Sequence, residues 1–100
     1  MILTWDLYEI TCDCAELHGV KLRGRIRKFT IESQTTCLIE NASDEQNVVR
    51  FALLTGADPS PVSEFVKALV PKAVVSEVLK DISNPVLSKL KVNDLSRYDI

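Results

Sequence analysis

A cluster of basic residues with a glycine just before it is the segment of this sequence best suited to chemistry. Five of the twelve Lys and Arg side chains lie between Lys21 and Lys28, with no acidic residue among them. His18-Gly19-Val20 comes directly before this cluster. A glycine turn that leads into a helix directs several backbone N–H groups toward one point, and an adjacent arginine can bind two phosphate oxygens. The pattern predicts a phosphate site at about Leu17 to Arg23.

Two other interpretations of the basic cluster remain open. Its side chains could form the solvated face of a surface element, which is the usual role of such a run. They could also bind nucleic acid, but base stacking favours aromatic residues between the charges, and only Phe29 lies nearby. The net charge of −2 gives no general attraction to nucleic acid or to anionic lipid. We therefore expect no nucleic-acid partner.

Three cysteines, Cys12, Cys14 and Cys37, are the other candidates for a chemical role. An odd number without a signal peptide is typical of reduced thiols, so we expect all three to be free. Cys12 and Cys14 with His18 match no common zinc spacing, and we expect neither a metal nor a cofactor. We interpret Cys37 as a small, buried apolar residue.

The elements that would position these residues follow from hydrophobic periodicity. Residues of high β propensity predict strands at five places, about Trp5–Asp13, Thr35–Glu40, Val48–Leu54, Ala73–Leu79 and Leu95–Ile100. For Ala73–Leu79 a helix is the alternative. A helix from about Pro61 to Val70 is indicated by Ser60 as N-cap and by Pro61 at the first helical position. Its apolar stripe would consist of Val62, Phe65, Val66 and Leu69.

The segment from Lys21 to Gln34 fits two structures. Its alternating basic residues suit a strand, whereas Leu22, Ile26 and Phe29 recur at helical spacing. As a helix it completes a β-α-β-β-α-β order, the ferredoxin-like sandwich with two helices on one face of an antiparallel sheet. As a strand it gives a mostly antiparallel α+β domain with one helix. We predict the helix, because the phosphate site needs a helix N-terminus behind it.

The same residues resemble two signatures of the acylphosphatase family. Leu17-His18-Gly19-Val20-Lys21-Leu22-Arg23 resembles the family's V-Q-G-V-x-F-R motif and keeps its glycine, second valine and arginine. Cys37-Leu38-Ile39-Glu40-Asn41 resembles its G-W-V-x-N strand end and keeps the asparagine. The interval of 18 residues between Arg23 and Asn41 is also the family's usual one. The resemblance extends over nearly the whole chain and implies a single acylphosphatase-like domain, residues 1–100.

The resemblance implies a hydrolase of acyl phosphates, which are carboxylic–phosphoric anhydrides, without metal or cofactor. Arg23 would hold the phosphate together with the backbone of residues 18–22, and Asn41 would position the attacking water. Hydrolysis of so reactive a group needs little beyond a water in line with phosphorus and neutralised oxygens. Arginine suits the first role because its planar fork matches two phosphate oxygens.

Several positions depart from the family pattern, and they define the alternative function. Four motif residues differ, namely His18, Leu22, Cys37 and Leu38. The hairpin after Asn41 carries Asp44 and Glu45, whose charge would lie near the site. Extra residues between Cys12 and Leu17 predict a bulge at the end of the first strand. The alternative is a catalytically impaired acylphosphatase-like module for anion binding or protein interaction.

Length and composition exclude several further classes. One hundred residues suit one domain, and 46% apolar with 26% charged residues argues against disorder. No apolar run approaches the ~20 residues that span a bilayer. The start, Met1 to Leu7, carries Asp6 and no basic region, so we do not expect a signal peptide. We expect a cytoplasmic monomer that binds a small acyl phosphate or inorganic phosphate and has no membrane partner.

Overall fold

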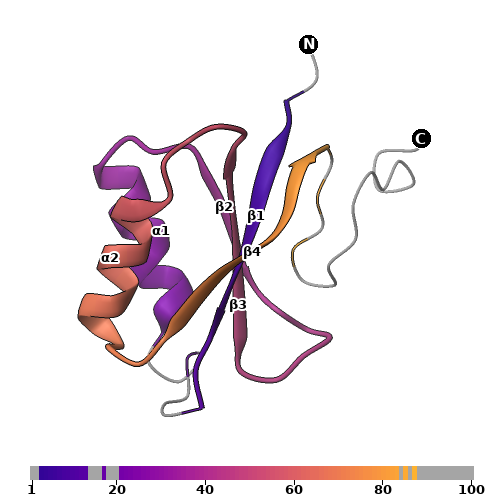
Figure 1. Cartoon of the computed structure of the whole chain (residues 1–100). Helices are drawn as coiled ribbons and strands as arrows, with labels where there is room; N and C mark the ends of the chain where they lie inside the picture. The colour runs from indigo at the N-terminus through magenta and orange to yellow at the C-terminus, as the bar shows by residue number, and fades with distance from the viewer. Residues whose placement is uncertain (1–2, 14–16, 18–20, 84, 86, 88–100) are drawn as a thin grey trace.

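The computed structural model describes residues 3–13, 17, 21–83, 85 and 87. Within them, four strands form one antiparallel sheet in the order β2-β3-β1-β4, and two helices cover one of its faces (Figure 1). The elements in chain order are β1 (Trp5–Thr11), α1 (Leu22–Glu32), β2 (Cys37–Asn41), β3 (Val48–Leu54), α2 (Ser60–Leu69) and β4 (Val74–Ile82). The predicted α+β class and the β-α-β-β-α-β element order are therefore confirmed.

The ambiguous segment is helical, as predicted. Leu22, Ile26 and Thr30 are buried on one side of α1, whereas the three arginines between them are exposed. The spacing of four between the buried positions makes one stripe along a helix, and this stripe packs against the sheet. The basic residues can stay exposed in either a strand or a helix, so their alternation does not decide the structure. Burial of the apolar stripe does decide it, and it favours the helix.

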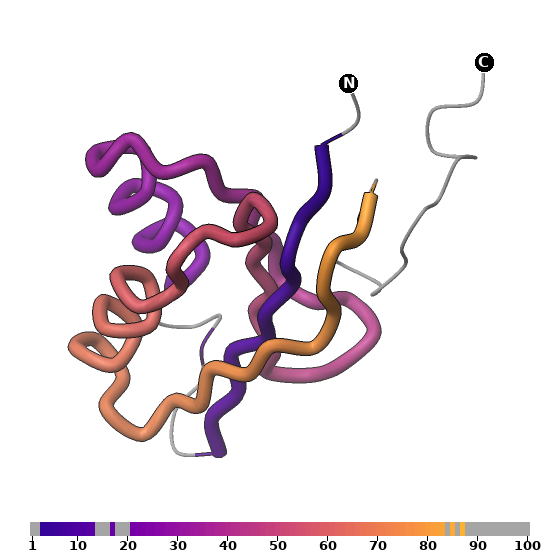
Figure 2. Tube along the Cα trace, turned by 45° about the horizontal axis from the view of Figure 1, so that its top comes forward, coloured from indigo at the N-terminus to yellow at the C-terminus, as the bar shows by residue number. Residues whose placement is uncertain are grey.

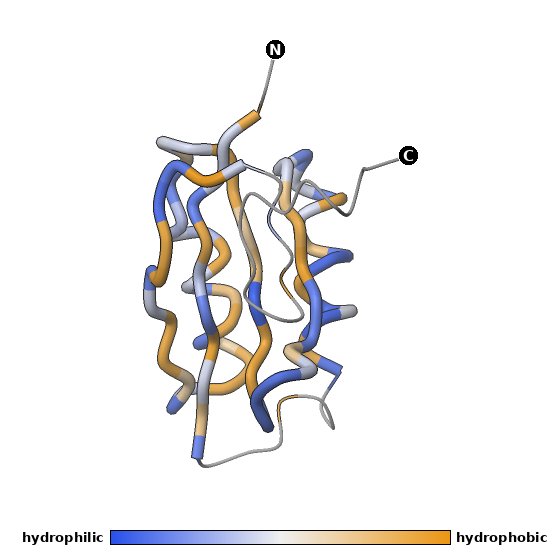
Figure 3. The backbone as a smooth tube through the Cα atoms, turned by 90° about the vertical axis from the view of Figure 1, so that its right-hand side faces the viewer, coloured by the Kyte–Doolittle hydropathy of each residue, from blue (hydrophilic) through white to orange (hydrophobic). Residues whose placement is uncertain are grey.

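The core has two parts, one on each face of the sheet. Side chains alternate along a strand, so Val49, Phe51 and Leu53 of β3 face the helices, and Ala52 faces away from them. Tyr8 of β1 stacks on Phe51 with ring centroids 4.9 Å apart. Trp5, Leu7, Ala52, Ile82 and Leu87 form the second cluster on the opposite face. Figure 3 shows how hydrophobic residues run along the strands.

Helix α2 differs in detail from the prediction. It begins at Ser60 with Pro59 as its N-cap, and the Ser60 N–H donates to Oδ1 of Asp58 at 2.9 Å. Asp58 thus takes the capping role expected of Ser60, and this hydrogen bond lowers the pKa of the Asp58 carboxyl. Leu69 is 38% exposed, because it lies in the last turn of the helix beyond the sheet contact made by Val62 and Val66.

Strands β1 and β4 lie side by side along their length, which Figure 2 shows from a second angle. Their pairing shifts register between Trp5 and Tyr8. There the buried Asp6 accepts N–H donors from Asp81 at 3.1 Å and Gly56 at 3.3 Å. The bulge predicted at 12–17 lies partly outside the described residues. The strand predicted at 95–100 lies wholly outside them.

No helix in the described part of the chain is long and apolar enough to span a membrane.

Candidate anion site

Arg23 and Asn41, distant in sequence, line the same surface pocket. Lys21 and Gly24 complete its lining, and its volume is about 430 Å³. Arg23 lies in the first turn of α1, and Asn41 is the last residue of β2, which packs beside this helix. Both residues are exposed and thus accessible to a ligand. The structure therefore brings together the two residues to which the acylphosphatase resemblance gives phosphate binding and water positioning.

The N-terminal end of α1 contributes positive charge to this pocket. The helix begins at Leu22, and its first turn contains no acidic residue and no side-chain cap. The N–H groups of Arg23 and Gly24 have no acceptor within the helix, because no helical carbonyl group precedes the first turn of an α-helix. Lys21 and Arg23 add two cations at the positive end of the helix dipole, where each is unfavourable without an anion. A bound anion would relieve this repulsion.

The backbone at the helix start also departs from ordinary geometry. Lys21 is the N-cap and adopts the left-handed conformation, with φ 58° and ψ 40°, which costs a non-glycine residue about 1 kcal/mol. Gly24 lowers helix stability by about the same amount relative to alanine. A Cβ added to Gly24 would meet no atom within 4 Å, so packing does not require the glycine. Gly24 is itself one of the residues that line the pocket.

Two of the amides expected to bind phosphate already have acceptors within the protein. The Leu17 N–H donates to Oδ1 of Asn47 at 2.6 Å, and the Leu22 N–H donates to the Leu17 carbonyl oxygen at 3.2 Å. Both leucine side chains are fully buried. His18, Gly19 and Val20 lie outside the described residues. Of the described residues in the predicted site, Leu17 to Arg23, the pocket is lined by Lys21 and Arg23, with Gly24 next to them.

Asn47 is a structural residue of this region that the sequence analysis did not identify. Its Oδ1 accepts from Leu17, and its Nδ2 donates to the Cys12 carbonyl oxygen at 2.5 Å. It thereby joins the β2–β3 loop to the chain that leads from β1 into α1. The backbone of Asn47 is left-handed, with φ 57°, a conformation that asparagine tolerates. Its place in a polar turn was the only signal in the sequence.

Replacing Asn47 with alanine should lower the free energy of unfolding by about 2 to 4 kcal/mol. The change removes both side-chain hydrogen bonds and places a Cβ-bearing residue without local polar support in a left-handed conformation. Asn47→Gly should lose about 1 kcal/mol less, since glycine adopts this conformation freely. Urea unfolding measures both, with the exposed Asn41→Ala as control. Equal free energies of unfolding for Asn47→Ala and Asn41→Ala would show that the hydrogen bonds from Asn47 to Leu17 and Cys12 do not stabilise the fold.

Arg50 is the second residue that the sequence analysis missed. Its side chain is fully buried, and its Nε donates to Glu9 at 2.7 Å. Its Nη1 donates to Asp44 at 2.7 Å and to the Leu87 carbonyl oxygen at 2.9 Å. Within the described residues its Nη2 has no hydrogen-bond partner, and Glu45 lies 3.9 Å from it. An arginine inside the apolar strand Val48–Leu54 was a usable signal, because such a charge needs buried partners.

This ion cluster changes the expected electrostatics of the anion site. Arg50 lies on the face of the sheet opposite the helices, since it alternates with the helix-facing Val49 and Phe51. The hydrogen bond from Arg50 holds the pKa of the Asp44 carboxyl below its ordinary value. Asp44 and Glu45 were expected to bring negative charge toward the loop after Asn41. Arg50 instead binds Asp44 and lies near Glu45, so it draws both carboxylates toward the face opposite the helices, although one guanidinium offsets only part of the charge of Glu9, Asp44 and Glu45.

The cysteines differ from the prediction in one respect. Cys12 is disulfide-bonded, and its partner lies outside the described residues, so the expectation of three free thiols is wrong. With three cysteines, at least one must be unpaired within the chain, but the other two can still form a disulfide. Cys37 is free and half-buried, and burial raises the pKa of its thiol to about 11. This thiol is therefore protonated near neutral pH and is not a nucleophile.

Comparisons with known proteins give no independent identification of the pocket. No family model, curated protein or solved structure matches the chain significantly. The chemistry of the pocket is therefore argued from its own lining, which combines two cations, helix amides and one side-chain amide. These groups suit a small anion and a water molecule. Among the described residues, no group of three or more His, Cys, Asp or Glu could hold a metal ion.

Proposed function

We propose that this protein hydrolyses acyl phosphates in the pocket that contains Arg23 and Asn41. The observation that carries the proposal is the shared pocket itself, in which Lys21, Arg23, Gly24 and Asn41 meet. We further propose that the fold is the ferredoxin-like sandwich. Its strand order, β2-β3-β1-β4, and the placement of both helices on one face are compatible with that fold. The resemblance of residues 17–23 and 37–41 to the acylphosphatase signatures supports the same function.

The pocket supplies the groups that this reaction needs. The Arg23 guanidinium binds two phosphoryl oxygens, and Lys21 and the helix amides offset the remaining charge. The side-chain carbonyl of Asn41 accepts a hydrogen bond from water and orients it toward phosphorus. The water oxygen bonds to phosphorus as the bond from phosphorus to the acyl oxygen breaks. The products are a carboxylate and inorganic phosphate, and the water proton passes to solvent.

The ion cluster at Arg50 favours both anion binding and turnover at the pocket. A carboxylate beside the pocket would repel both the phosphoryl group and the developing negative charge of the transition state. The nearest such groups from the β2–β3 loop are Asp44 and Glu45, and Arg50 attracts both. Asn41 is neutral, so it can orient water without adding a repelling charge.

One observation favours the second candidate, an anion-binding module without turnover. Leu17 and Leu22 use their amides within the protein, so fewer donors are available for the phosphoryl oxygens. With fewer donors, an anion would still bind through the charges of Lys21 and Arg23. The protein would then bind the transition state little more tightly than the substrate. Catalysis depends on that difference in affinity, so hydrolysis would be slow.

Hydrolysis of acetyl phosphate, followed by ³¹P NMR, tests the proposal. We expect a rate above the spontaneous one, insensitive to a metal chelator and inhibited competitively by inorganic phosphate. The inhibition links turnover to the pocket, because the product occupies the same cations as the substrate. Phosphate binding without hydrolysis would establish the module instead. A protein that neither binds phosphate nor hydrolyses the substrate would exclude both candidates.

A further inference from the structure

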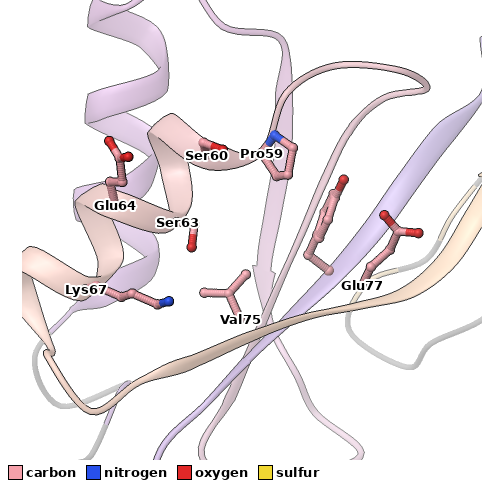
Figure 4. Close-up of a pocket in the computed structure, with 8 residues that line it drawn as sticks. Pro59, Ser60, Ser63, Glu64, Lys67, Val75 and Glu77 are labelled. Carbon is pink, nitrogen blue, oxygen red and sulfur yellow. The ribbon is translucent and has the colours of Figure 1, made fainter.

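A second pocket lies on the helix-covered side of the molecule, between α2 and β4 (Figure 4). Its volume is about 330 Å³, at the lower end of the range for small-molecule sites. It shares no lining residue with the pocket at Arg23. The proposed hydrolysis gives no role to any residue of this second pocket.

Opposite charges stand on the two sides of this pocket. Figure 4 shows the Lys67 side chain extending from α2 toward Val75, and the Glu77 carboxylate rising from β4 on the other side. Among the residues that the structure describes, Lys67 has no ion-pair partner. Glu77 lies 3.4 Å from the exposed Lys80, a contact that solvent weakens. Glu77 also shares a side-chain hydrogen bond with Tyr8. A carboxylate has about four acceptor sites, so Glu77 can still pair with a ligand ammonium group while Lys67 takes the opposite charge.

The surface between the charges is apolar with single hydroxyl groups. Pro59 and Val75 supply apolar contacts, and the Ser63 hydroxyl points into the hollow (Figure 4). Tyr8 pairs with Glu77 across the strands and is almost fully buried. Burial and the nearby Glu77 raise the pKa of the Tyr8 hydroxyl, so it remains a hydrogen-bond donor.

We propose that this pocket binds a small amino acid as a zwitterion. Its carboxylate would pair with Lys67 and accept from Ser63, and its ammonium group would pair with Glu77. Its carbon chain would lie over Val75 and Pro59. A ligand with one charge would leave either Lys67 or Glu77 without its partner, so the pocket selects for both charges in one molecule.

Titration of the ¹⁵N-labelled protein with glycine, β-alanine and 4-aminobutyrate tests this assignment. The series increases the distance between ammonium and carboxylate, and one member should shift the amides of Ser63, Val75 and Glu77 with millimolar affinity or better. Butyrate and butylamine carry the separate charges and should bind at least about tenfold more weakly. Lys67→Met and Glu77→Gln should each weaken the best ligand by about tenfold or more.

Glu64→Gln is the matched control, because Glu64 borders the pocket but points away from it in Figure 4. This variant should bind the best ligand as the wild type does. All three changes are at solvent-accessible positions of α2 or β4, and circular dichroism verifies that the fold is retained. Absence of shifts up to about 10 mM for the whole series would overturn the proposal. Equal binding of butyrate or butylamine, or an equal loss in Glu64→Gln, would overturn it too.

Discussion

Replacing Arg50 with methionine should lower the free energy of unfolding by about 3 to 5 kcal/mol. Methionine keeps much of the volume but removes the guanidinium that three groups share, namely Glu9, Asp44 and the Leu87 carbonyl. Glu9, whose side chain is only 17% exposed, would then carry an unpaired charge at the sheet. Removing one member of a buried ion cluster is costly because the desolvated partner charge stays behind.

Urea unfolding measures this loss, and Arg27→Met is the matched control. Arg27 is exposed on α1, so its replacement should change stability by no more than about 0.5 kcal/mol. Arg50→Lys should be intermediate, because one ammonium group cannot reproduce the planar fork. If Arg50→Met unfolds at the same urea concentration as the control, the cluster contributes nothing to the folded state.

The pH dependence of stability checks the same cluster independently. The pKa of Asp44 in the folded protein lies below its ordinary value of 3.8. Its contribution is therefore fully present above that value and is lost as the pH falls through the lower, folded pKa. The wild type should lose stability in this acidic range, and Arg50→Met should lose less, since its Asp44 titrates near the ordinary pKa.

Substitutions at Arg23 and Asn41 should separate binding from turnover. Arg23→Ala should weaken phosphate binding by about 10- to 100-fold and abolish hydrolysis, because the substrate and the transition state share its charge. Asn41→Ala should leave phosphate affinity nearly unchanged and lower turnover by about 100-fold, since only the orientation of the water is lost. Phosphate titration by NMR and the acetyl phosphate assay measure the two quantities.

Arg25→Ala and Arg27→Ala are the matched controls for Arg23. Both residues are exposed on the same helix, and neither lines the pocket. Each change should therefore alter affinity and turnover little. If either one matters as much as Arg23, the site is a diffuse basic surface, and the roles transferred from the acylphosphatase family do not hold.

The local elements of this protein were predictable from the sequence because each has its own periodicity. Val48–Leu54 is a strand with the predicted bounds, and the stripe of Leu22 and Ile26 produces α1 within one or two residues of the expected range. The neighbourhood of Arg23 and Asn41 also follows from element order, since one residue begins a helix and the other ends the strand that packs beside it. The bounds of the elements and the proximity of these two residues both follow from the spacing of residues along the chain, which can be read from the sequence.

Only the tertiary structure decided which polar groups are paired. Arg50 meets Glu9 across 41 positions of sequence, and Asn47 meets Leu17 across 30, so no local pattern encodes either contact. The Leu17 contact removes an amide from the predicted phosphate site, and the Arg50 cluster draws Asp44 to the opposite face of the sheet. Burial forces such pairings, because a desolvated polar group without a partner destabilises the fold. The partner becomes known only when distant strands and loops have been placed side by side.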